Sequence, residues 1–215
     1  MNRTFYWVAT ALVAVALAAT LLAYPQLPSS VPSHWGLHNE VNGYSPRWTL
    51  FLLGPGAMVL VIALFSLLPW LSPKHFEVDT FRPTYLQVML IIVTMLGYVH
   101  GIVLWTALGH KVDTGRAVEG GICLLLVLLG NVMGKVRRNF YVGIRTPWAL
   151  ANERVWNATH RFAAKTFVAG GVLGFAFTLA GWSDWPVMAA IAAGALAPAL
   201  YSLIFYKQLE RHGEV

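Results

Sequence analysis

Six apolar runs separated by short polar segments constrain this chain more than any other feature of its sequence. Several of the runs reach about 20 residues, and at a helical rise of about 1.5 Å per residue such a run is long enough to cross a hydrocarbon core about 30 Å thick. Only 11% of the 215 residues are charged, whereas a soluble domain carries about 25%. We therefore predict an all-α membrane protein, a bundle of six transmembrane helices. The predicted spans are 5–24, 48–70, 86–108, 118–134, 166–182 and 186–206.

The Lys and Arg residues predict which side of the membrane each segment faces. Cytoplasmic loops carry an excess of these cations. With the N-terminus inside, twelve of the fifteen Lys and Arg residues fall on inner segments and three on outer segments, and segment 135–165 alone holds seven. We therefore predict that both termini are cytoplasmic. Because the net charge of +6 is concentrated between the spans, the expected partners are anionic lipid headgroups and not nucleic acid.

The first outer loop, residues 25–48, is predicted to form an ordered cap. Pro25, Pro28 and Pro32 exclude a regular helix and favour extended or turn conformations. The pair at 42–43, Asn-Gly, is typical of a turn. We expect this loop to bind a ligand or partner through His34, Trp35, Gly43 and Tyr44. The alternative is that His34 and Trp35 only seat the loop at the membrane interface.

His34 and His38, with Glu40 nearby, are of the types that ligate a divalent metal. Two His residues at i and i+4 form such a site only on a helix, and the prolines argue against one. We therefore predict no metal here. The single Cys123 excludes a disulfide within the chain.

Three polar side chains lie inside the predicted spans, where such groups are costly and often functional. His100 and Glu119 lie in the outer part of the third and fourth spans, and Asn131 lies near the inner end of the fourth. His100 and Glu119 would pair, relay a proton or hold a ligand if the helices bring them together. The alternative is that these groups only bond to carbonyls or headgroup water. Gly130 and Gly134 have the spacing of closely packed membrane helices.

The inner segment 135–165 is predicted to end in a basic amphipathic helix between the fourth and fifth spans. Thr146 is a predicted N-cap with Pro147 at the first helical position, and about 18 helical residues follow from Trp148. At 100° per residue, one face carries Trp148, Ala151, Val155, Thr159 and Phe162, a second carries Arg154, Asn157, Arg161 and Lys165, and a third carries Trp156 and His160. Such a helix is suited to lie in the inner membrane interface.

Basic residues on this segment are expected either to anchor it to lipid or to bind a phosphate or an acidic partner. Arg137, Arg138 and Arg145 lie near turns, where backbone amides and guanidinium groups together hold anions. The predicted binding residues of the segment are Asn139, Arg145, Thr146, Trp148, Arg154, Trp156, His160 and Arg161. The chain lacks a nucleophile elbow, a Gly-rich nucleotide loop, a zinc-protease helix and a carboxylate pair. We therefore predict neither an enzyme nor a cofactor.

Two stretches of the sequence resemble known protein families. The sequence GNVMGKVRRNFYVGIRTPWALANERVWNATHRFAAK, residues 130–165, closely resembles the signature of the SdpI family of bacterial membrane proteins. LPSSVPSHWGLHNEVNGYSPR, residues 27–47, is similar to the DUF1648 module that often precedes it. The resemblance divides the chain into a DUF1648-like module at 1–75 and an SdpI-like module at 76–215.

The resemblance implies a function. The named member of the SdpI family is an immunity protein that protects a toxin-producing cell from its own secreted antimicrobial peptide, and it also holds a transcriptional repressor at the membrane. The implied location is the bacterial cytoplasmic membrane, and the implied partners are a peptide toxin outside and a repressor inside. Two alternatives remain open: a transporter or flippase using His100, Glu119 and Asn131 as a polar path, and an intramembrane enzyme with metal at His34 and His38.

Overall fold

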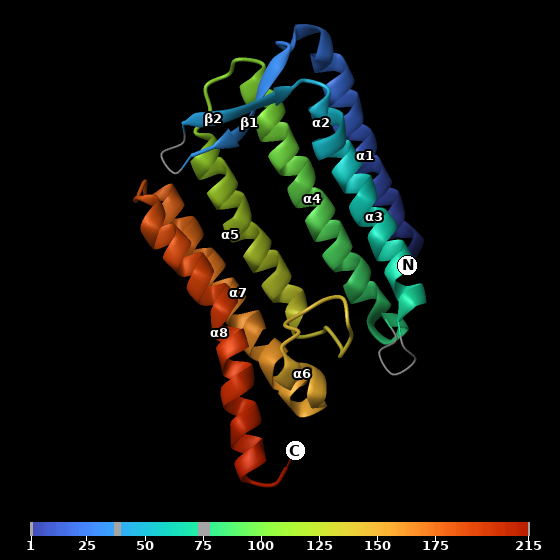
Figure 1. The fold of residues 1–215 in the computed structure, drawn as a ribbon, viewed down its shortest axis with the longest axis vertical. Coiled ribbons are helices and arrows are strands. Elements are labelled where there is room, and N and C mark those ends of the chain that lie inside the picture. Colours follow the sequence, from blue (N-terminus) through green and yellow to red (C-terminus); the bar gives the residue numbers. More distant parts are fainter. Residues whose placement is uncertain (1, 37–39, 73–77, 215) are drawn as a thin grey trace. The chain divides into compact units, whose positions relative to one another are not determined.

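Six long apolar helices make up most of the computed structural model, which describes residues 2–36, 40–72 and 78–214 (Figure 1). Within these ranges, the stretches long and apolar enough to cross a membrane are Asn2–Gln26, Thr49–Leu71, Val78–Ala107, Thr114–Met133, Glu153–Leu179 and Asp184–Arg211. This confirms the predicted multi-pass helical architecture. Leu22, Leu179 and Leu200 are more than half exposed on these helices, as expected of surfaces that face lipid.

The helices form two compact units, residues 1–65 with 89–121 and residues 66–88 with 122–215. Helices α4 (Arg82–Ala107) and α5 (Thr114–Met133) contribute to both units. The division into modules at 1–75 and 76–215 rests on sequence motifs alone and stays a prediction.

The first unit contains a β-hairpin between its first two spans (Figure 1). From the N-terminus, the elements are α1 (Asn2–Ala23), a 3-10 turn (Tyr24–Gln26), β1 (Ser30–Trp35), β2 (Val41–Pro46), α2 (Thr49–Phe51), a π-helical turn (Leu52–Gly56) and α3 (Ala57–Leu67). Short 3-10 turns at Leu68–Leu71 and Val78–Phe81 follow, and they belong to the second unit. A buried cluster of Ala23, Leu27, Val31, Leu50, Leu104 and Ala107 joins the hairpin to α1, α2 and α4. The described residues of the predicted outer cap are therefore ordered, because apolar side chains at both ends of the loop are anchored in one core.

The position of the Asn42-Gly43 pair corrects one prediction. The pair does not form the turn of the hairpin; it lies within β2, and Gly43 pairs with His34 of β1 where the register shifts. A Cβ atom at Gly43 would lie 2.8 Å from His34 Cβ. Glycine is therefore required here by the close approach of the neighbouring strand rather than by a turn conformation.

A π-helical turn interrupts the second span at Leu52–Gly56, around Pro55. Proline has no N–H to donate and its ring clashes with the preceding turn, so the helix widens locally. Gly54 lies in this turn, and a Cβ atom there would overlap the His100 ring. The turn thus makes room for His100 of α4.

The second unit is built around an antiparallel pair, α7 (Glu153–Leu179) and α8 (Asp184–Arg211), which lie side by side in Figure 1. A Cβ atom at Gly170 would lie 2.6 Å from the Ala190 carbonyl oxygen and 3.0 Å from Gly194 Cα. Lipid tails are as apolar as leucine, so close backbone approach through small residues drives such packing. On α5, a Cβ atom at Gly130 would lie 3.0 Å from the Ala164 carbonyl oxygen, which confirms the close packing predicted for Gly130.

The predicted amphipathic helix is not a separate element. A short helix, α6 (Pro147–Ala151), begins at the predicted N-cap Thr146, but Asn152 is extended and ends it. Asn152 Oδ1 then accepts hydrogen bonds from the Arg154 and Val155 amides and so caps α7. From there α7 runs through residue 165 into the fifth span without a break, since no residue in that stretch stops a helix.

Substitution of Gly170 is expected to force α7 and α8 apart. Gly170→Val would lower the midpoint of thermal unfolding in detergent by about 5 °C, because overpacking costs about 1–3 kcal/mol. Gly101→Val is the matched control, since nothing lies within 4 Å of a Cβ atom at Gly101. Equal midpoints for the two variants would contradict the close crossing.

Candidate functional site

A small pocket lies beneath the hairpin of the first unit. Its volume is about 200 Å³. The lining residues are Val31, Pro32, Ser33, Trp35, Thr49, Leu50, Leu53, Leu96, Val99, His100 and Val103. Most of these side chains are apolar. The structure thus brings Trp35 of the predicted outer loop and His100 of the third span into one pocket, which we call the hairpin pocket.

His100 is buried and bonded to α1. Thr20 Oγ1 donates a hydrogen bond to the Ala16 carbonyl oxygen at 2.8 Å, so its oxygen accepts from His100 Nε2, also at 2.8 Å. His100 Nε2 therefore carries a hydrogen. This contact fixes the imidazole ring between α1, the π-helical turn at Gly54 and the hairpin pocket.

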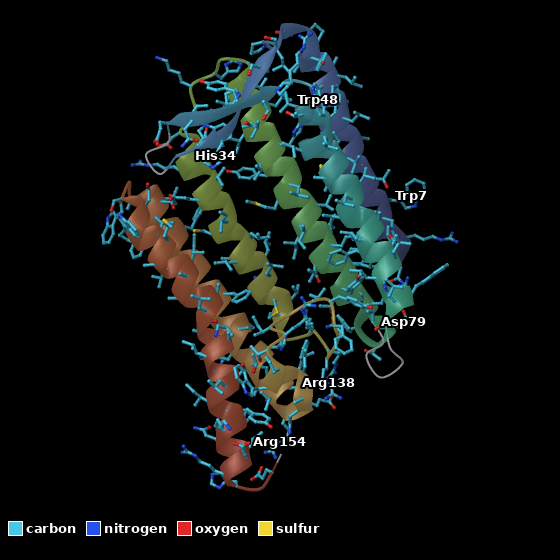
Figure 2. All side chains as sticks on the ribbon, viewed as in Figure 1. Trp7, His34, Trp48, Asp79, Arg138 and Arg154 are labelled. Carbon is cyan, nitrogen blue, oxygen red and sulfur yellow. The ribbon has the colours of Figure 1, made fainter. Side chains whose placement is uncertain are left out.

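The other predicted outer residues lie on the hairpin itself. His34 is exposed (Figure 2), and its Nδ1 donates to Asn42 Oδ1 across the strands. Gly43 packs against the Cβ atom of His34, and the Tyr44 side chain is 63% exposed. Trp35 alone of the four is found in the lining of the hairpin pocket.

The three intramembrane groups have separate surroundings. Glu119 is half-buried in α5, and the hydrogen-bond partner found for His100 is Thr20. Asn131 is exposed, and its Nδ2 donates to the Val127 carbonyl oxygen of its own helix at 2.9 Å. The Asn131 bond matches the structural alternative, in which a polar group in a span bonds to a nearby carbonyl. The His100 bond does not, because it joins two helices through the Thr20 hydroxyl.

A metal site has no support among the described residues, since no three His, Cys, Asp or Glu side chains in those ranges lie close enough to hold an ion. His38 lies outside the described residues. The metal hypothesis at His34 and His38 is therefore untested.

The inner segment folds around Asn139, which is fully buried in the second unit. Its Nδ2 donates to the carbonyl oxygens of Arg137 and Val142 at 2.7 and 2.9 Å. Its Oδ1 accepts from the amides of Tyr141 and Val142, both at 2.7 Å. One amide side chain thereby fixes the backbone of residues 137–142, which have no helix or strand to satisfy them.

Trp156 and His160 join this loop to α7. Trp156 Nε1 donates to the Val136 carbonyl oxygen at 2.8 Å, and the two rings stack with centroids 4.1 Å apart. His160 Nε2 lies 3.0 Å from the Ile144 amide, which can only donate. The Nε2 atom is therefore the acceptor, and Nδ1 carries the hydrogen and donates to the Trp156 carbonyl oxygen at 2.8 Å.

The burial of these residues changes the predicted pattern of helix faces. Val155, Trp156, Thr159 and His160 are all buried, although Trp156 and His160 were assigned a face of their own. The loop covers this side of α7, so the buried surface is wider than the expected apolar stripe. These residues therefore face protein, not lipid.

Three other predicted binding residues of this segment lie at the end of the loop or on α6. Thr146 Oγ1 accepts from the Ala149 amide at 3.3 Å and lies 2.8 Å from Ser202 Oγ of α8. Arg145 is exposed, and its guanidinium donates to the Phe140 carbonyl oxygen. Trp148 is half-buried on α6.

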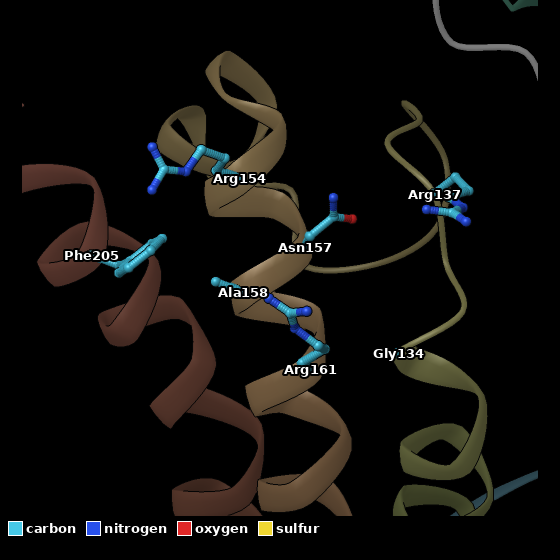
Figure 3. Close-up of a pocket in the computed structure, with 7 residues that line it drawn as sticks. All are labelled: Gly134, Arg137, Arg154, Asn157, Ala158, Arg161 and Phe205. Carbon is cyan, nitrogen blue, oxygen red and sulfur yellow. The ribbon is translucent and has the colours of Figure 1, made fainter. Parts of the chain in front are cut away.

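A second pocket, of about 390 Å³, lies in the second unit and carries the arginines. Its lining residues are Gly134, Arg137, Arg154, Asn157, Ala158, Arg161 and Phe205. Figure 3 shows Arg154, Asn157 and Arg161 along one stretch of α7, Arg137 on the facing loop and Phe205 on α8. We call it the arginine pocket. Arg154 also forms an ion pair of 2.5 Å with Glu214.

Sequence reasoning left several of these residues out of the predicted site. Arg137, Asn157 and Phe205 line the arginine pocket, and Thr20 bonds His100. Arg137 and Asn157 carried a signal, because Arg137 lies near a turn and Asn157 shares a helix face with Arg154 and Arg161. Nothing in the sequence pointed to Thr20 or Phe205, because Thr20 is distant in sequence from His100 and Phe205 is distant from the arginines of the pocket.

Gly143 is expected to tolerate no side chain. Its φ is +114°, and a Cβ atom would overlap His160 Nε2. Gly143→Ala should therefore lower the unfolding midpoint through both backbone strain, about 1–3 kcal/mol, and loss of the His160 contact. Gly109→Ala is the control for strain alone, because its φ is +88° with nothing within 4 Å of the added Cβ atom. Similar midpoints for the two variants would contradict the His160 contact.

Comparison with known proteins finds matches to two stretches of the chain. Residues 135–205 match the SdpI/YfhL protein family, and residues 11–59 match a domain of unknown function, DUF1648. The chain is 26% identical to the immunity protein SdpI of Bacillus subtilis (strain 168) over 162 residues, which cover 75% of each chain. No solved structure matches the chain significantly. The predicted resemblance is confirmed: this is a membrane protein in which a segment that matches the SdpI/YfhL family follows a segment that matches DUF1648.

Proposed function

We propose that this chain is an immunity protein of the bacterial cytoplasmic membrane that protects its cell from a secreted antimicrobial peptide. The observation that carries this proposal is the similarity to the Bacillus subtilis immunity protein over three-quarters of both chains. That relative is named for immunity and not for catalysis, and we propose no enzymatic role for this chain.

The orientation is part of the proposal. Both termini and the segment 135–165 lie in the cytoplasm, and the β-hairpin lies outside. The excess of Lys and Arg on the inner segments supports this arrangement. A toxin arriving from outside then meets the hairpin first.

The hairpin pocket is proposed to receive one large apolar side chain of the toxin. Its volume of about 200 Å³ is below the range of about 300–1,000 Å³ usual for sites that enclose whole small molecules. Its walls are mainly apolar, with the Trp35 ring from the hairpin and the buried His100 among the residues that line it. Deeply seated apolar anchors of this kind dominate peptide recognition.

On the cytoplasmic side, the finer proposal is that the exposed part of the inner segment holds a transcriptional regulator. Arg145 is exposed there, and Arg138 is tied to α6 by a 3.3 Å hydrogen bond to the Leu150 carbonyl oxygen. A basic surface on an ordered loop suits an acidic segment of a partner protein.

The transporter alternative has less support. It needs a polar path from His100 and Glu119 to Asn131, yet Asn131 bonds to its own helix and His100 bonds to Thr20. His100 also lines the same pocket as Trp35, so loss of function on replacing His100 would not separate transport from toxin binding. Asn131→Ala separates them, because only a transport path requires Asn131.

Deletion of the gene from its host is expected to lower the concentration of secreted peptide toxin that inhibits growth. Complementation with Trp35→Ala should restore much less protection than the unaltered chain, because loss of an aromatic anchor weakens binding by about 2 kcal/mol, roughly thirtyfold. The control is Trp70→Ala, whose side chain is 89% exposed and outside the hairpin pocket. Unchanged sensitivity in the deletion strain, measured as growth against peptide dilution, would refute immunity.

The orientation is tested by cysteine labelling of intact cells with a membrane-impermeant maleimide. Ser30→Cys should be labelled from outside, whereas Ala151→Cys should react only after the membrane is opened. Both positions are exposed in the structure, and the native Cys123 is fully buried, so background labelling should be low. Labelling of Ala151→Cys in intact cells would invert the topology.

A further inference from the structure

We propose that the arginine pocket binds the phosphate group of an anionic phospholipid, through Arg137, Asn157 and Arg161. This proposal goes beyond toxin protection. It uses the predictions that segment 135–165 lies at the inner membrane surface and that the fifth span begins at Thr166.

Charge is the first argument. Segment 135–165 contains seven Lys and Arg residues and one acidic residue, Glu153. In the part of the chain that the structure describes, Arg154 is paired with Glu214, but neither Arg137 nor Arg161 forms an ion pair. Guanidinium groups lining one cavity without a carboxylate favour an anion, and their planar fork suits a phosphate.

Depth is the second argument. Arg161 precedes Thr166, where the predicted fifth span begins, by five residues, or about 7.5 Å of helix. The headgroup layer on each side of a bilayer is about 5–7.5 Å thick, so the Arg161 backbone would lie at its outer edge, from where the long side chain reaches the lipid phosphates. Arg154 lies about 18 Å from Thr166 by the same rise, beyond the headgroups and in water, where Glu214 is its partner.

The pocket is also held in place before any ligand arrives. The Arg137 carbonyl oxygen accepts from Asn139 Nδ2, and the adjacent Val136 carbonyl oxygen accepts from Trp156 Nε1. Trp156 lies one residue before Asn157 on α7, so the loop carrying Arg137 is fastened to the helix that carries the other two ligand residues. Binding therefore costs little ordering of the backbone.

The rest of the lining favours a lipid over a free anion. Gly134, Ala158 and Phe205 add apolar surface beside the arginines. Gly134 directly follows α5, and Phe205 lies in α8. A phospholipid places its phosphate and its glycerol and acyl groups side by side, so it matches both parts of the lining, whereas inorganic phosphate matches only the cationic part.

The test is a titration of the detergent-purified full chain with dioctanoyl-phosphatidylglycerol, followed by thermal shift or native mass spectrometry. Arg161→Gln and Arg137→Gln should each weaken binding at least about tenfold, as expected for a charge-assisted contact. Lys165→Gln is the matched control: it removes the same charge from an exposed position of α7 near the membrane but outside the pocket. A cation that acts only through the general surface charge changes the affinity for an anionic lipid by at most about fivefold.

The outcomes are distinct. If Lys165→Gln weakens lipid binding as much as Arg161→Gln does, the lipid is held by the general surface charge, and the pocket proposal is overturned. The proposal is also overturned if the unaltered chain does not bind the lipid. If inorganic phosphate binds as tightly as phosphatidylglycerol, and the variants weaken its binding in the same order, the pocket is a phosphate site but its ligand is not a lipid. Lipid binding is measured without any toxin, so a failure here leaves the protection assay unaffected, and the converse also holds.

Glu214 gives an independent check. If Arg154 belongs to the solvent-side ion pair, Glu214→Gln should leave phosphatidylglycerol affinity within about fivefold of the unaltered value, since exposed pairs contribute little. A larger change would place Arg154 among the ligands and contradict the assignment of the site to Arg137, Asn157 and Arg161.

Discussion

The second unit of this protein depends on one imidazole ring held between a loop and a helix. His160 accepts from the Ile144 amide and donates to the Trp156 carbonyl oxygen, so a single neutral tautomer satisfies both contacts. The ring is almost fully buried and leaves no room for a side chain at Gly143. Together with the four hydrogen bonds of Asn139, this contact holds residues 136–144 against α7. Without it, the loop would carry buried backbone groups with no partner, each costing about 1–3 kcal/mol.

That arrangement separates two roles among residues of one basic segment. Asn139, Trp156 and His160 are buried and position the backbone, whereas Arg137 and Arg161 are exposed and line a cavity. The three buried residues fix the loop relative to α7, and this places Arg137 of the loop and Arg161 of the helix on the same cavity. In the first unit the hairpin plays the comparable part, since its buried ends hold Trp35 over the cavity that His100 also lines.

Small residues set the packing within the lipid. No hydrophobic driving force joins helices in a bilayer, so their backbones must approach closely to gain dispersion contacts. Gly170 and Gly194 do so between α7 and α8, and Gly171 does so between α7 and α5. Gly54 serves another purpose, because its missing side chain makes space for the His100 ring beside a π-helical turn. The same residue type therefore supports helix association at one place and a polar site at another.

The sequence by itself determined the number and approximate limits of the membrane helices, because the length of each apolar run can be read locally and compared with the fixed thickness of a bilayer. It also identified Thr146 as a cap and the family-like segments. Only the tertiary structure decided that Asn42-Gly43 lies within a strand, that α7 continues from Glu153 into the fifth span, and that Trp156 and His160 face a loop. It also decided that His100 bonds Thr20, 80 residues away along the chain. Such outcomes depend on which distant segment covers a given side chain, and neither periodicity nor charge along the chain contains that information.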